Sequence, residues 1–489
     1  MPILKITQGQ KSSEILFDGT PVLSSLLREH GFPIDLPCGG RGICGKCRVE
    51  ASGCLSPLTA KETAAGGRLA CQTHLLGDAR VNLISKQLME NIAASGELPS
   101  FLINPLQGRY GMAVDIGTTT LAATLIDLTN GQVLATATEE NAQRMIAADV
   151  IGRIEGALDG QSNLLQDLAA KAVDDLRGRL CSQVKIPTDA IDQTIITGNT
   201  TMLYLYTGRN PEPLSHAPFQ ADFLFGHWVS PNMYLPQCLS AFVGADITCA
   251  ILASQMCIHE ETALLVDIGT NGEVVLWHEG KLYVCATAAG PAFEGSGLEH
   301  GCSSVAGAID GVWVQDGSLA FSTISAVPAM GICGSGIIDL LQTLLKLQQL
   351  DETGLLFTER IQLEGQIYLT QKDVRNVQLA KSAIMAGILT LCQTVGVDLS
   401  DVAVLYLAGG FGKHINLQNA AGIGLIPQAL VDRTKVIGNA SLVGAQMLLL
   451  QKNFLKETEN YLQNSQVVTL SSNPLFSENY INSMMLEPV

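Results

Sequence analysis

The chain has 489 residues, of which 47% are hydrophobic and 15% charged, and it contains 48 glycines. That length exceeds what one hydrophobic core serves, so we expect two to four domains of a turn-rich α/β type. The formal net charge of −17 argues against nucleic acid or an anionic membrane surface as a partner.

Nothing in the sequence indicates export or a membrane anchor. The first residues lack the apolar core and cleavage site of a signal peptide, and no run of about 18 apolar residues occurs. Thirteen cysteines in such a chain indicate reduced thiols, some of them metal ligands. We therefore expect a cytoplasmic protein with no membrane partner.

A glycine-rich segment near the N-terminus contains three of the four cysteines of a motif. Cys38, Cys44 and Cys47 have the spacing C-x5-C-x2-C, and Cys71 follows at a distance. Glycines let the backbone wrap tightly and aim N–H groups at bridging sulfides, while four thiolates neutralise iron. The spacing is close to the plant-type C-x4-C-x2-C…C pattern of a [2Fe–2S] cluster, with one extra residue in the first gap. The sequence therefore predicts a [2Fe–2S] cluster ligated by these four cysteines.

Other uses of these cysteines fit the pattern less well. A structural zinc site usually shows two C-x2-C pairs, and Cys71 has no such neighbour. Inert core thiols are a further reading, although four cysteines fall in one short, glycine-rich setting. Cys54 could replace Cys71 as the fourth ligand, but the sequence Arg-Leu-Ala-Cys-Gln around Cys71 is the better match to the last ligand strand of a ferredoxin. Cys54 is then a thiol without a ligand role.

The segment around the cysteines resembles a β-grasp ferredoxin domain of the α+β class. Alternating runs at 3–7 and 14–17 predict a hairpin, and 21–30 has helical spacing. We place this domain at residues 1–85. Residues 86–109, with glycine and proline, are expected to form a linker, with room for one short helix.

Two similar hairpins, about 150 residues apart, organise the rest of the chain. Asp115-Ile-Gly-Thr-Thr-Thr120 and Asp267-Ile-Gly-Thr-Asn-Gly272 each follow an apolar run and precede another. Each turn offers backbone N–H groups that suit phosphate oxygens, and the first turn adds three threonine hydroxyls. Repetition at this spacing predicts a duplicated fold that closes on a nucleotide.

Three further glycine turns lie between and after the hairpins. Gly198-Asn199 ends a predicted strand, the place where α/β folds bind ligands. Gly334-Ser335-Gly336 starts a predicted helix, either as an anion or ribose site or as a plain N-terminus capped by Ser335. Gly409-Gly410-Phe411-Gly412 ends another strand, where glycine permits close approach of a ring or a ribose.

Less informative stretches give simpler expectations. Helical spacing occurs at 145–158, 164–181 and 373–395, while 208–240, rich in proline and aromatic residues, reads as an irregular connection.

The order of these motifs resembles the acetate-kinase, sugar-kinase, Hsp70 and actin superfamily. The resemblance implies a two-lobed α/β actin-like ATPase domain, a duplicated ribonuclease H-like fold, with lobes at 110–245 and 246–489. It also implies that Asp115 and Asp267 orient Mg²⁺ and the attacking water. The residues that would hold ATP are Gly117, Thr118, Thr119, Thr120, Gly198, Asn199, Gly269, Thr270, Asn271, Gly272, Gly334, Ser335, Gly336, Gly409, Gly410 and Phe411.

A plant-type ferredoxin fused to such a domain resembles the ATP-dependent reductive activators of corrinoid proteins. The phrases that carry this resemblance are Val-Asp-Ile-Gly-Thr-Asn-Gly-Glu, Gly-Pro-Ala-Phe-Glu-Gly, Ile-Cys-Gly-Ser-Gly-Ile-Ile-Asp and Ala-Gly-Gly-Phe-Gly. The resemblance implies one-electron reduction of inactive Co(II) to Co(I) through the [2Fe–2S] cluster, driven by ATP hydrolysis. It implies a corrinoid protein of a methyltransferase system and a low-potential electron donor as partners, and it makes a homodimer plausible.

Three other functions remain open from the sequence. The first is ATP-coupled activation of a different low-potential metalloenzyme, such as a radical dehydratase. Activators of that kind share a cluster between subunits through paired cysteines, and Cys285, Cys302 and Cys333 form no compact pair. The second is a small-molecule kinase regulated by a redox-sensing ferredoxin. The third is an ATP-gated scaffold, which predicts no iron.

Overall fold

The computed structural model describes most of the chain, with short gaps. The described residues are 1–8, 11–30, 32, 34, 36, 40, 42, 47–65, 67–83, 96–409 and 415–489. They form two compact units, one with Met1–Gln87, Glu140–Ala172 and Tyr204–Ala217, the other with Leu88–Glu139, Val173–Leu203 and Pro218–Val489. None of the helices in the described part of the chain combines the length and apolarity that crossing a bilayer requires.

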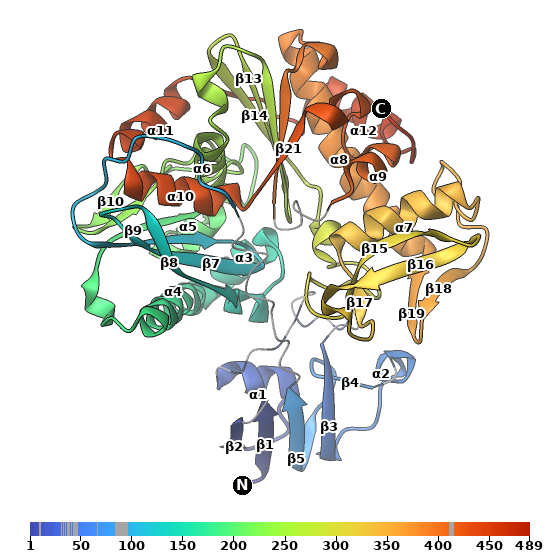
Figure 1. The fold of residues 1–489 in the computed structure, drawn as a ribbon. Coiled ribbons are helices and arrows are strands. Elements are labelled where there is room, and N and C mark those ends of the chain that lie inside the picture. The colour runs from blue at the N-terminus through green and yellow to red at the C-terminus, as the bar shows by residue number, and fades with distance from the viewer. Residues whose placement is uncertain are drawn as a thin grey trace. The chain divides into compact units, whose positions relative to one another are not determined.

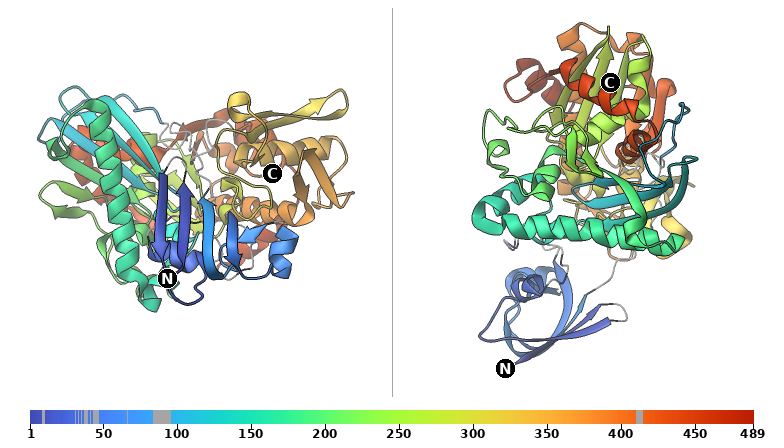
Figure 2. Two further views of the ribbon diagram at one scale, coloured as in Figure 1. Left: turned by 90° about the horizontal axis from the view of Figure 1, so that it is seen from below. Right: turned by 90° about the vertical axis from the view of Figure 1, so that its left-hand side faces the viewer.

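The N-terminal segment folds into a five-stranded mixed sheet in the order β2-β1-β5-β3-β4, drawn in blue in Figure 2. Its strands are β1 (Ile3–Gln8), β2 (Lys11–Leu16), β3 (Arg48–Leu55), β4 (Arg68–Leu69) and β5 (Leu75–Leu83). The predicted hairpin is present, since β1 pairs antiparallel with β2, and β1 also pairs parallel with β5. Helix α1 (Leu23–Glu29) contributes Leu23, Leu26 and Leu27 to the core of this sheet.

The first predicted nucleotide hairpin lies in a six-stranded sheet with the order β10-β11-β9-β6-β7-β8. Its strands are β6 (Tyr110–Ile116), β7 (Thr120–Asp127), β8 (Gln132–Glu140), β9 (Ile191–Gly198), β10 (His227–Ser230) and β11 (Met233–Leu235). β6 pairs antiparallel with β7 and parallel with β9. Asp115 therefore stands at the end of β6, directly before the hairpin turn.

A second six-stranded sheet repeats this arrangement, in the order β21-β20-β12-β13-β14-β22. Its strands are β12 (Ala263–Ile268), β13 (Gly272–His278), β14 (Lys281–Thr287), β20 (Val404–Ala408), β21 (Thr434–Gly438) and β22 (Ser465–Val467). β12 corresponds to β6, because it pairs antiparallel with the next strand and parallel with β20. The continuous apolar run of β12 fits a strand buried on both faces. The predicted duplication is thus present in the fold.

The helices besides α1 are distributed along the chain. α2 (Ala60–Ala65) lies in the N-terminal segment. The others are α3 (Val150–Gly156), α4 (Ser162–Val184), α5 (Thr200–Thr207), α6 (Ala245–Ser254), α7 (Gly334–Lys346), α8 (Gln371–Val395), α9 (Leu417–Gly422), α10 (Ala440–Leu450), α11 (Asn453–Gln463) and α12 (Pro474–Asn482). Every residue of α10 is buried, because this helix packs on α6, β6 and β9. Figure 1 shows α10, in red, beside α6.

Smaller sheets complete the C-terminal half. β15 (Ala308–Gln315), β16 (Ser318–Thr323) and β17 (Gly331–Ile332) form one, and β18 (Arg360–Glu364) and β19 (Ile367–Thr370) form the other. The predicted helix at 373–395 is α8, which starts at a capping box formed by Thr370 and Asp373.

Some expectations from the sequence differ from the structure. The helix expected at 145–158 begins only at Val150, because the Asp149 side chain accepts a hydrogen bond from Gly152 N and caps α3 there. The irregular connection expected at 208–240 contains β10 and β11, whose three or four residues are too few to show alternation. In the linker expected at 86–109, residues 84–95 lie outside the described part and the described remainder contains no helix. The domain boundaries stay a prediction.

Candidate functional site

Two of the four predicted cluster cysteines lie next to each other in the N-terminal segment. The Sγ atoms of Cys47 and Cys71 are 3.2 Å apart, although 24 residues separate them. The Ala70 N–H donates to the Cys47 carbonyl oxygen at 2.8 Å, which ties together the two backbone segments that carry these thiols. Cys38 and Cys44 lie outside the described residues. The neighbouring thiols fit the donor set of a thiolate-ligated cluster.

Cys54, the alternative fourth ligand, lies apart from this pair. It is exposed on β3, whereas Cys47 is buried and Cys71 partly buried. The geometry therefore favours Cys71 over Cys54 as the partner of Cys47.

A cavity of about 230 Å³ lies where the two hairpin turns meet. Its lining brings together residues that are up to 326 positions apart in the sequence. The lining residues are Asp115, Gly117, Thr118, Thr119, Thr120, Ala122, Thr138, Asn199, Asp246, Asp267, Ile268, Gly269, Thr270, Asn271, Glu273, Phe293, Glu294, Cys302, Ser303, Ser304, Gly334, Gly409, Asn439 and Ser441.

The residues predicted for ATP binding or catalysis fall into three groups. Those that line the cavity are Asp115, Gly117, Thr118, Thr119, Thr120, Asn199, Asp267, Gly269, Thr270, Asn271, Gly334 and Gly409. Those in the described chain but outside the lining are Gly198, Gly272, Ser335 and Gly336. Gly410 and Phe411 lie outside the described residues.

Gly198 and Gly409 occupy equivalent places in the two halves of the duplicated fold. Gly409 lines the cavity, whereas Gly198 does not. A Cβ at Gly198 would lie 2.7 Å from the Ile116 carbonyl oxygen, and one at Gly409 would lie 2.5 Å from the Ile268 carbonyl oxygen. Each glycine thus lets one strand end approach the strand that carries the hairpin aspartate. Glycine is therefore needed at both positions for close packing of the backbone, since a side chain would clash with the neighbouring strand.

The helix start at Gly334 is closely packed, since a Cβ there would lie 2.1 Å from the Phe293 carbonyl oxygen. Cys333 is the N-cap of α7 and makes no side-chain cap, so the predicted capping by Ser335 is absent. The Ser335 hydroxyl instead lies 3.4 Å from the Cys333 Sγ, and Ser335 is buried. Of this glycine-serine turn, only Gly334 reaches the cavity wall.

Asp115 is held by side chains from the far end of the sequence. Asn439 Nδ2 donates to its Oδ2 at 3.0 Å and Ser441 Oγ to its Oδ1 at 3.1 Å. Burial raises the pKa of Asp115 to about 6, against the opposing effect of these two hydrogen bonds. The carboxylate is therefore fixed in orientation at the start of α10.

Four more carboxyl groups share the cavity with Asp115, and the pKa values of three of them are raised. Burial, together with the charges of Asp115 and Glu294, raises the pKa of Asp267 to about 7. Burial and the charges of Asp115 and Asp267 raise the pKa of Asp246 to about 8. Burial and the charges of Asp246 and Asp267 also raise the pKa of Glu273 well above its usual range. When charged, these carboxyl groups repel one another, and this repulsion adds to the effect of burial on their pKa values.

Glu294 connects the two hairpin turns through one oxygen atom. Its Oε2 accepts hydrogen bonds from Thr119 Oγ1 at 2.8 Å and from Thr270 Oγ1 at 2.9 Å. Thr119 follows β6 and Thr270 follows β12, so the carboxylate joins equivalent turns of the two halves. On the first turn, Thr118 Oγ1 also accepts from Asn199 Nδ2 at 3.1 Å.

Among the cavity residues to which the sequence assigned no role are Asp246, Glu273, Glu294, Asn439 and Ser441. A local signal existed for two of them. Asp246 follows Gly244 in the first turn of α6, and Glu294 is the glutamate of the phrase Gly-Pro-Ala-Phe-Glu-Gly. Asn439 and Ser441 give no local signal, because only the packing of α10 against β6 brings them to Asp115.

Comparisons with known proteins identify the family. Family models match residues 6–76 (2Fe-2S iron-sulfur cluster binding domain), 110–259 (RACo middle region) and 261–488 (C-terminal domain of RACo, the ASKHA domain). The corrinoid activation enzyme RamQ of Eubacterium limosum is 33% identical over 418 residues, which cover 77% of this chain and 70% of RamQ. The chain belongs to the family of reductive activators of corrinoid proteins.

Two further comparisons agree with this membership. The [Co(II) methylated amine-specific corrinoid protein] reductase of Methanosarcina barkeri is 25% identical over 390 residues, 71% of each chain. A solved structure described as a reductive activator for corrinoid, iron-sulfur protein superposes with a TM-score of 0.71 at 26% identity. That match covers 99% of this chain and 98% of the other. The predictions of family and fold class are confirmed, and the domains matched support a [2Fe–2S] cluster and imply ATP binding.

Proposed function

We propose that this protein reduces the Co(II) form of a corrinoid protein to Co(I), with the electron carried by a [2Fe–2S] cluster and the reaction driven by ATP hydrolysis. The observation that carries the proposal is the presence, in one chain related to corrinoid activators, of paired cluster thiols and of a cavity between two phosphate-type hairpins. The partners are then a corrinoid protein of a methyltransferase system and a low-potential electron donor.

The energetics explain why a nucleotide belongs in the same chain. A plant-type [2Fe–2S] centre has a potential of about −400 mV. If the Co(II) corrinoid lies a few hundred millivolts below that, one electron costs on the order of 7 kcal/mol. ATP can supply this only by binding the reducing conformation of the complex more tightly than the resting one. The cavity residues are the means of that coupling.

The two hairpin turns have suitable groups for the phosphates of ATP. We assign the hydroxyls of Thr118, Thr119 and Thr270 and the turn N–H groups to the phosphate oxygens. The segments at Gly334 and at 409–411 are assigned to the adenosine. Glu294 holds Thr119 and Thr270 in place, so a phosphate would take over hydroxyls that Glu294 already orients.

A divalent cation is the finer part of the proposal. Asp115 and Asp267 would hold Mg²⁺ and orient the attacking water, and a cation among these carboxyl groups would relieve the repulsion that raises their pKa values. In the described part of the chain, no three acidic, histidine or cysteine side chains converge closely enough to hold a metal by themselves. This fits Mg²⁺, which usually keeps several waters and shares one or two carboxylates with substrate phosphates.

The cluster site would supply one-electron transfer when the cluster is bound. Cys47 and Cys71, with Cys38 and Cys44, would provide its four thiolates. The buried position of Cys47 shields the thiols of this pair from solvent on one side.

The test is anaerobic absorbance of a Co(II) corrinoid methyl-carrier protein mixed with this protein and a low-potential donor, with and without MgATP. We expect the Co(I) band to grow only with MgATP. Cys47→Ser and Asp267→Asn should each abolish it, whereas Cys54→Ser, which changes an exposed thiol, should not. Co(I) formation that ignores ATP would overturn the proposal.

Absence of Co(I) with any corrinoid partner would redirect the proposal. An iron–sulfur spectrum with steady ATP hydrolysis would then indicate another low-potential metalloenzyme as the acceptor. Phosphorylation of a sugar or acid without any redox partner would indicate a redox-regulated kinase instead.

A further inference from the structure

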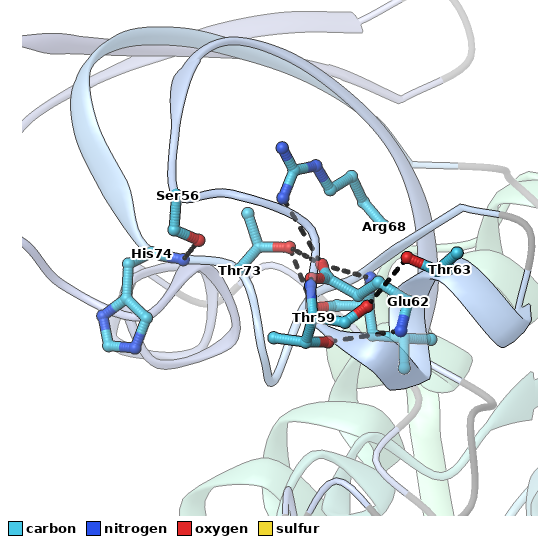
Figure 3. Close-up of polar contacts among 8 residues, drawn as sticks. Ser56, Thr59, Glu62, Thr63, Arg68, Thr73 and His74 are labelled. Carbon is cyan, nitrogen blue, oxygen red and sulfur yellow. Dashed lines mark hydrogen bonds and ion pairs between the residues drawn. The ribbon is translucent and has the colours of Figure 1, made fainter.

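Glu62 is a carboxylate buried in the core of the ferredoxin-like segment. Its residue exposure is 0%, which is rare for a glutamate unless the charge is well bonded. Oε2 accepts from Thr59 N at 2.8 Å, and Oε1 accepts from Thr73 Oγ1 at 2.7 Å and from Leu69 N at 3.2 Å. Figure 3 shows Thr59 and Thr73 beside the Glu62 carboxylate. A buried carboxylate with three hydrogen-bond donors fixes the positions of the residues that donate to it.

The donors to Oε1 lie on both sides of Cys71. Leu69 is two residues before it and Thr73 two residues after it. The turn between them is closed by Thr73 N and Gln72 N, which donate to the Leu69 carbonyl oxygen at 3.0 and 2.8 Å. Glu62 therefore holds the two ends of the turn that presents the Cys71 thiol.

The neighbouring side chain on the same helix reaches the other cysteine segment. Lys61 Nζ donates to the Gly42 carbonyl oxygen at 2.5 Å. Gly42 lies between Cys38 and Cys44 in the sequence. Consecutive residues of α2 thus bind the two segments that supply the predicted ligands.

The carboxylate of Glu62 is held in its charged form. Burial by itself would raise the pKa of Glu62, but the hydrogen bonds from Thr59, Thr73 and Leu69 outweigh it and bring the pKa below its usual value. Arg68 Nη1 lies 3.7 Å from Oε1, too far for a hydrogen bond, so it compensates the negative charge only in part. Loss of the carboxylate would leave the Arg68 charge uncompensated in this segment.

We propose that α2 is a clamp for the iron–sulfur centre, in which Glu62 positions the Cys71 turn and lowers the reduction potential, while Lys61 anchors the loop of the first cysteines. A nearby negative charge disfavours the reduced cluster, which carries one more electron, so it makes the centre a stronger reductant. This inference rests on the proposed function, because a low potential is what reduction of a Co(II) corrinoid demands.

The test compares Glu62→Gln and Lys61→Met with Glu50→Gln in the full-length protein. Glu50→Gln is the matched control, since it removes an exposed carboxylate from the same segment. The readouts are iron content, the visible circular dichroism of the cluster, its rate of loss to a chelator, and its midpoint potential in a dye-mediated titration. None of these measurements requires ATP or a corrinoid protein. A failure of this inference can therefore be distinguished from a failure of the proposed function.

We expect Glu62→Gln to lose the cluster several-fold faster than Glu50→Gln and to shift the remaining cluster to a higher midpoint potential. Glutamine keeps the shape but turns an amide NH₂ toward one of the former donors. Lys61→Met should accelerate cluster loss as well. A release rate and potential in Glu62→Gln equal to those of Glu50→Gln would overturn the proposal. If Glu62→Gln fails to fold, the test depends on Lys61→Met, which should fold because the Lys61 side chain is exposed. Cluster release from Lys61→Met that is no faster than from Glu50→Gln would then refute the clamp.

Discussion

One oxygen atom of Glu294 joins the turns of both nucleotide hairpins. Without it, the Thr119 and Thr270 hydroxyls lose their common acceptor and the turns lose a direct link. We expect Glu294→Ala to lower kcat for ATP hydrolysis by about 10²-fold, the loss that a misplacement of about 1 Å can cause. Affinity for a non-hydrolysable ATP analogue should change much less. Steady-state hydrolysis and calorimetry of analogue binding measure the two quantities.

Glu260→Ala is the control for this prediction, since Glu260 is exposed and outside the cavity. If Glu294→Ala hydrolyses ATP at the rate of Glu260→Ala, Glu294 has no part in turnover and the two hydroxyls are oriented by other groups.

Asp246 gives the molecule a pH-dependent stability. Its pKa is about 8 in the folded protein and about 3.9 in an unfolded chain. Between these values the folded protein keeps a proton that the unfolded chain has released, so the contribution of Asp246 to the free energy of unfolding falls as pH rises. Asp246→Asn removes this group. Its stability advantage over the unmodified protein should grow from about pH 4 to about pH 8 and then level off.

Thermal unfolding of the nucleotide-free protein at several pH values measures this advantage. Each kcal/mol corresponds to a shift in Tm of about 2–4 °C for a domain of 150–250 residues. Asp401→Asn, at an exposed position, serves as the control. A difference between Asp246→Asn and the unmodified protein that is constant with pH would contradict the prediction.

How much of the cavity the sequence predicts depends on the range of the contacts. The turns at Asp115 and Asp267 are local motifs, and twelve of the residues proposed for nucleotide binding or catalysis line the cavity. The pairing of Asp115 with Asn439 and Ser441 spans more than 320 residues, and no local pattern encodes it. Helix packing, which periodicity does not specify, decides such contacts.

At the scale of elements, long apolar strands and repeated turns were predictable, whereas short strands were not. β12 and β13 have sequence patterns that determine their type and pairing. β10 and β11 lack such a pattern, and they exist because β9 offers an edge on which β11 can pair. Whether a segment of three or four residues forms a strand therefore depends on its tertiary contacts.

The start of helix α7 depends on close backbone contact. A methyl group at Gly336 would lie 2.1 Å from the Ile309 carbonyl oxygen. We expect Gly336→Ala to lower the free energy of unfolding by about 1–3 kcal/mol, the usual cost of overpacking, and to weaken nucleotide binding through displacement of Gly334. Denaturant unfolding and analogue titration measure these effects.

Gly178→Ala provides the opposite case on helix α4. No heavy atom lies within 4 Å of a Cβ built at Gly178, and alanine favours a helix over glycine by about 1 kcal/mol. The control should therefore be neutral or stabilising. Equal stability losses in both variants would show that the α7 contact has no special role.

At the scale of the whole molecule, the two candidate centres belong to different compact units. The cluster cysteines lie in the unit that contains Met1–Gln87, and all residues that line the cavity belong to the other unit. The N-terminal sheet has a core of its own, distinct from the cores around the two six-stranded sheets. Each centre should therefore assemble without the other, while the electron transfer to a corrinoid protein requires both.

Removal of each centre in turn tests this separation. Extraction of iron with a chelator under reducing conditions should abolish Co(I) formation but leave the affinity for a non-hydrolysable ATP analogue within about twofold of the intact protein. Asp267→Asn should lose nucleotide-dependent activity yet keep the midpoint potential of the cluster, because the substitution lies outside the unit that holds the thiols. Calorimetry and a dye-mediated titration give the two readouts. If the midpoint potential of the cluster shifts in Asp267→Asn without nucleotide, the prediction is wrong. The two centres would then be coupled even in the nucleotide-free protein, and ATP would only change the strength of that coupling.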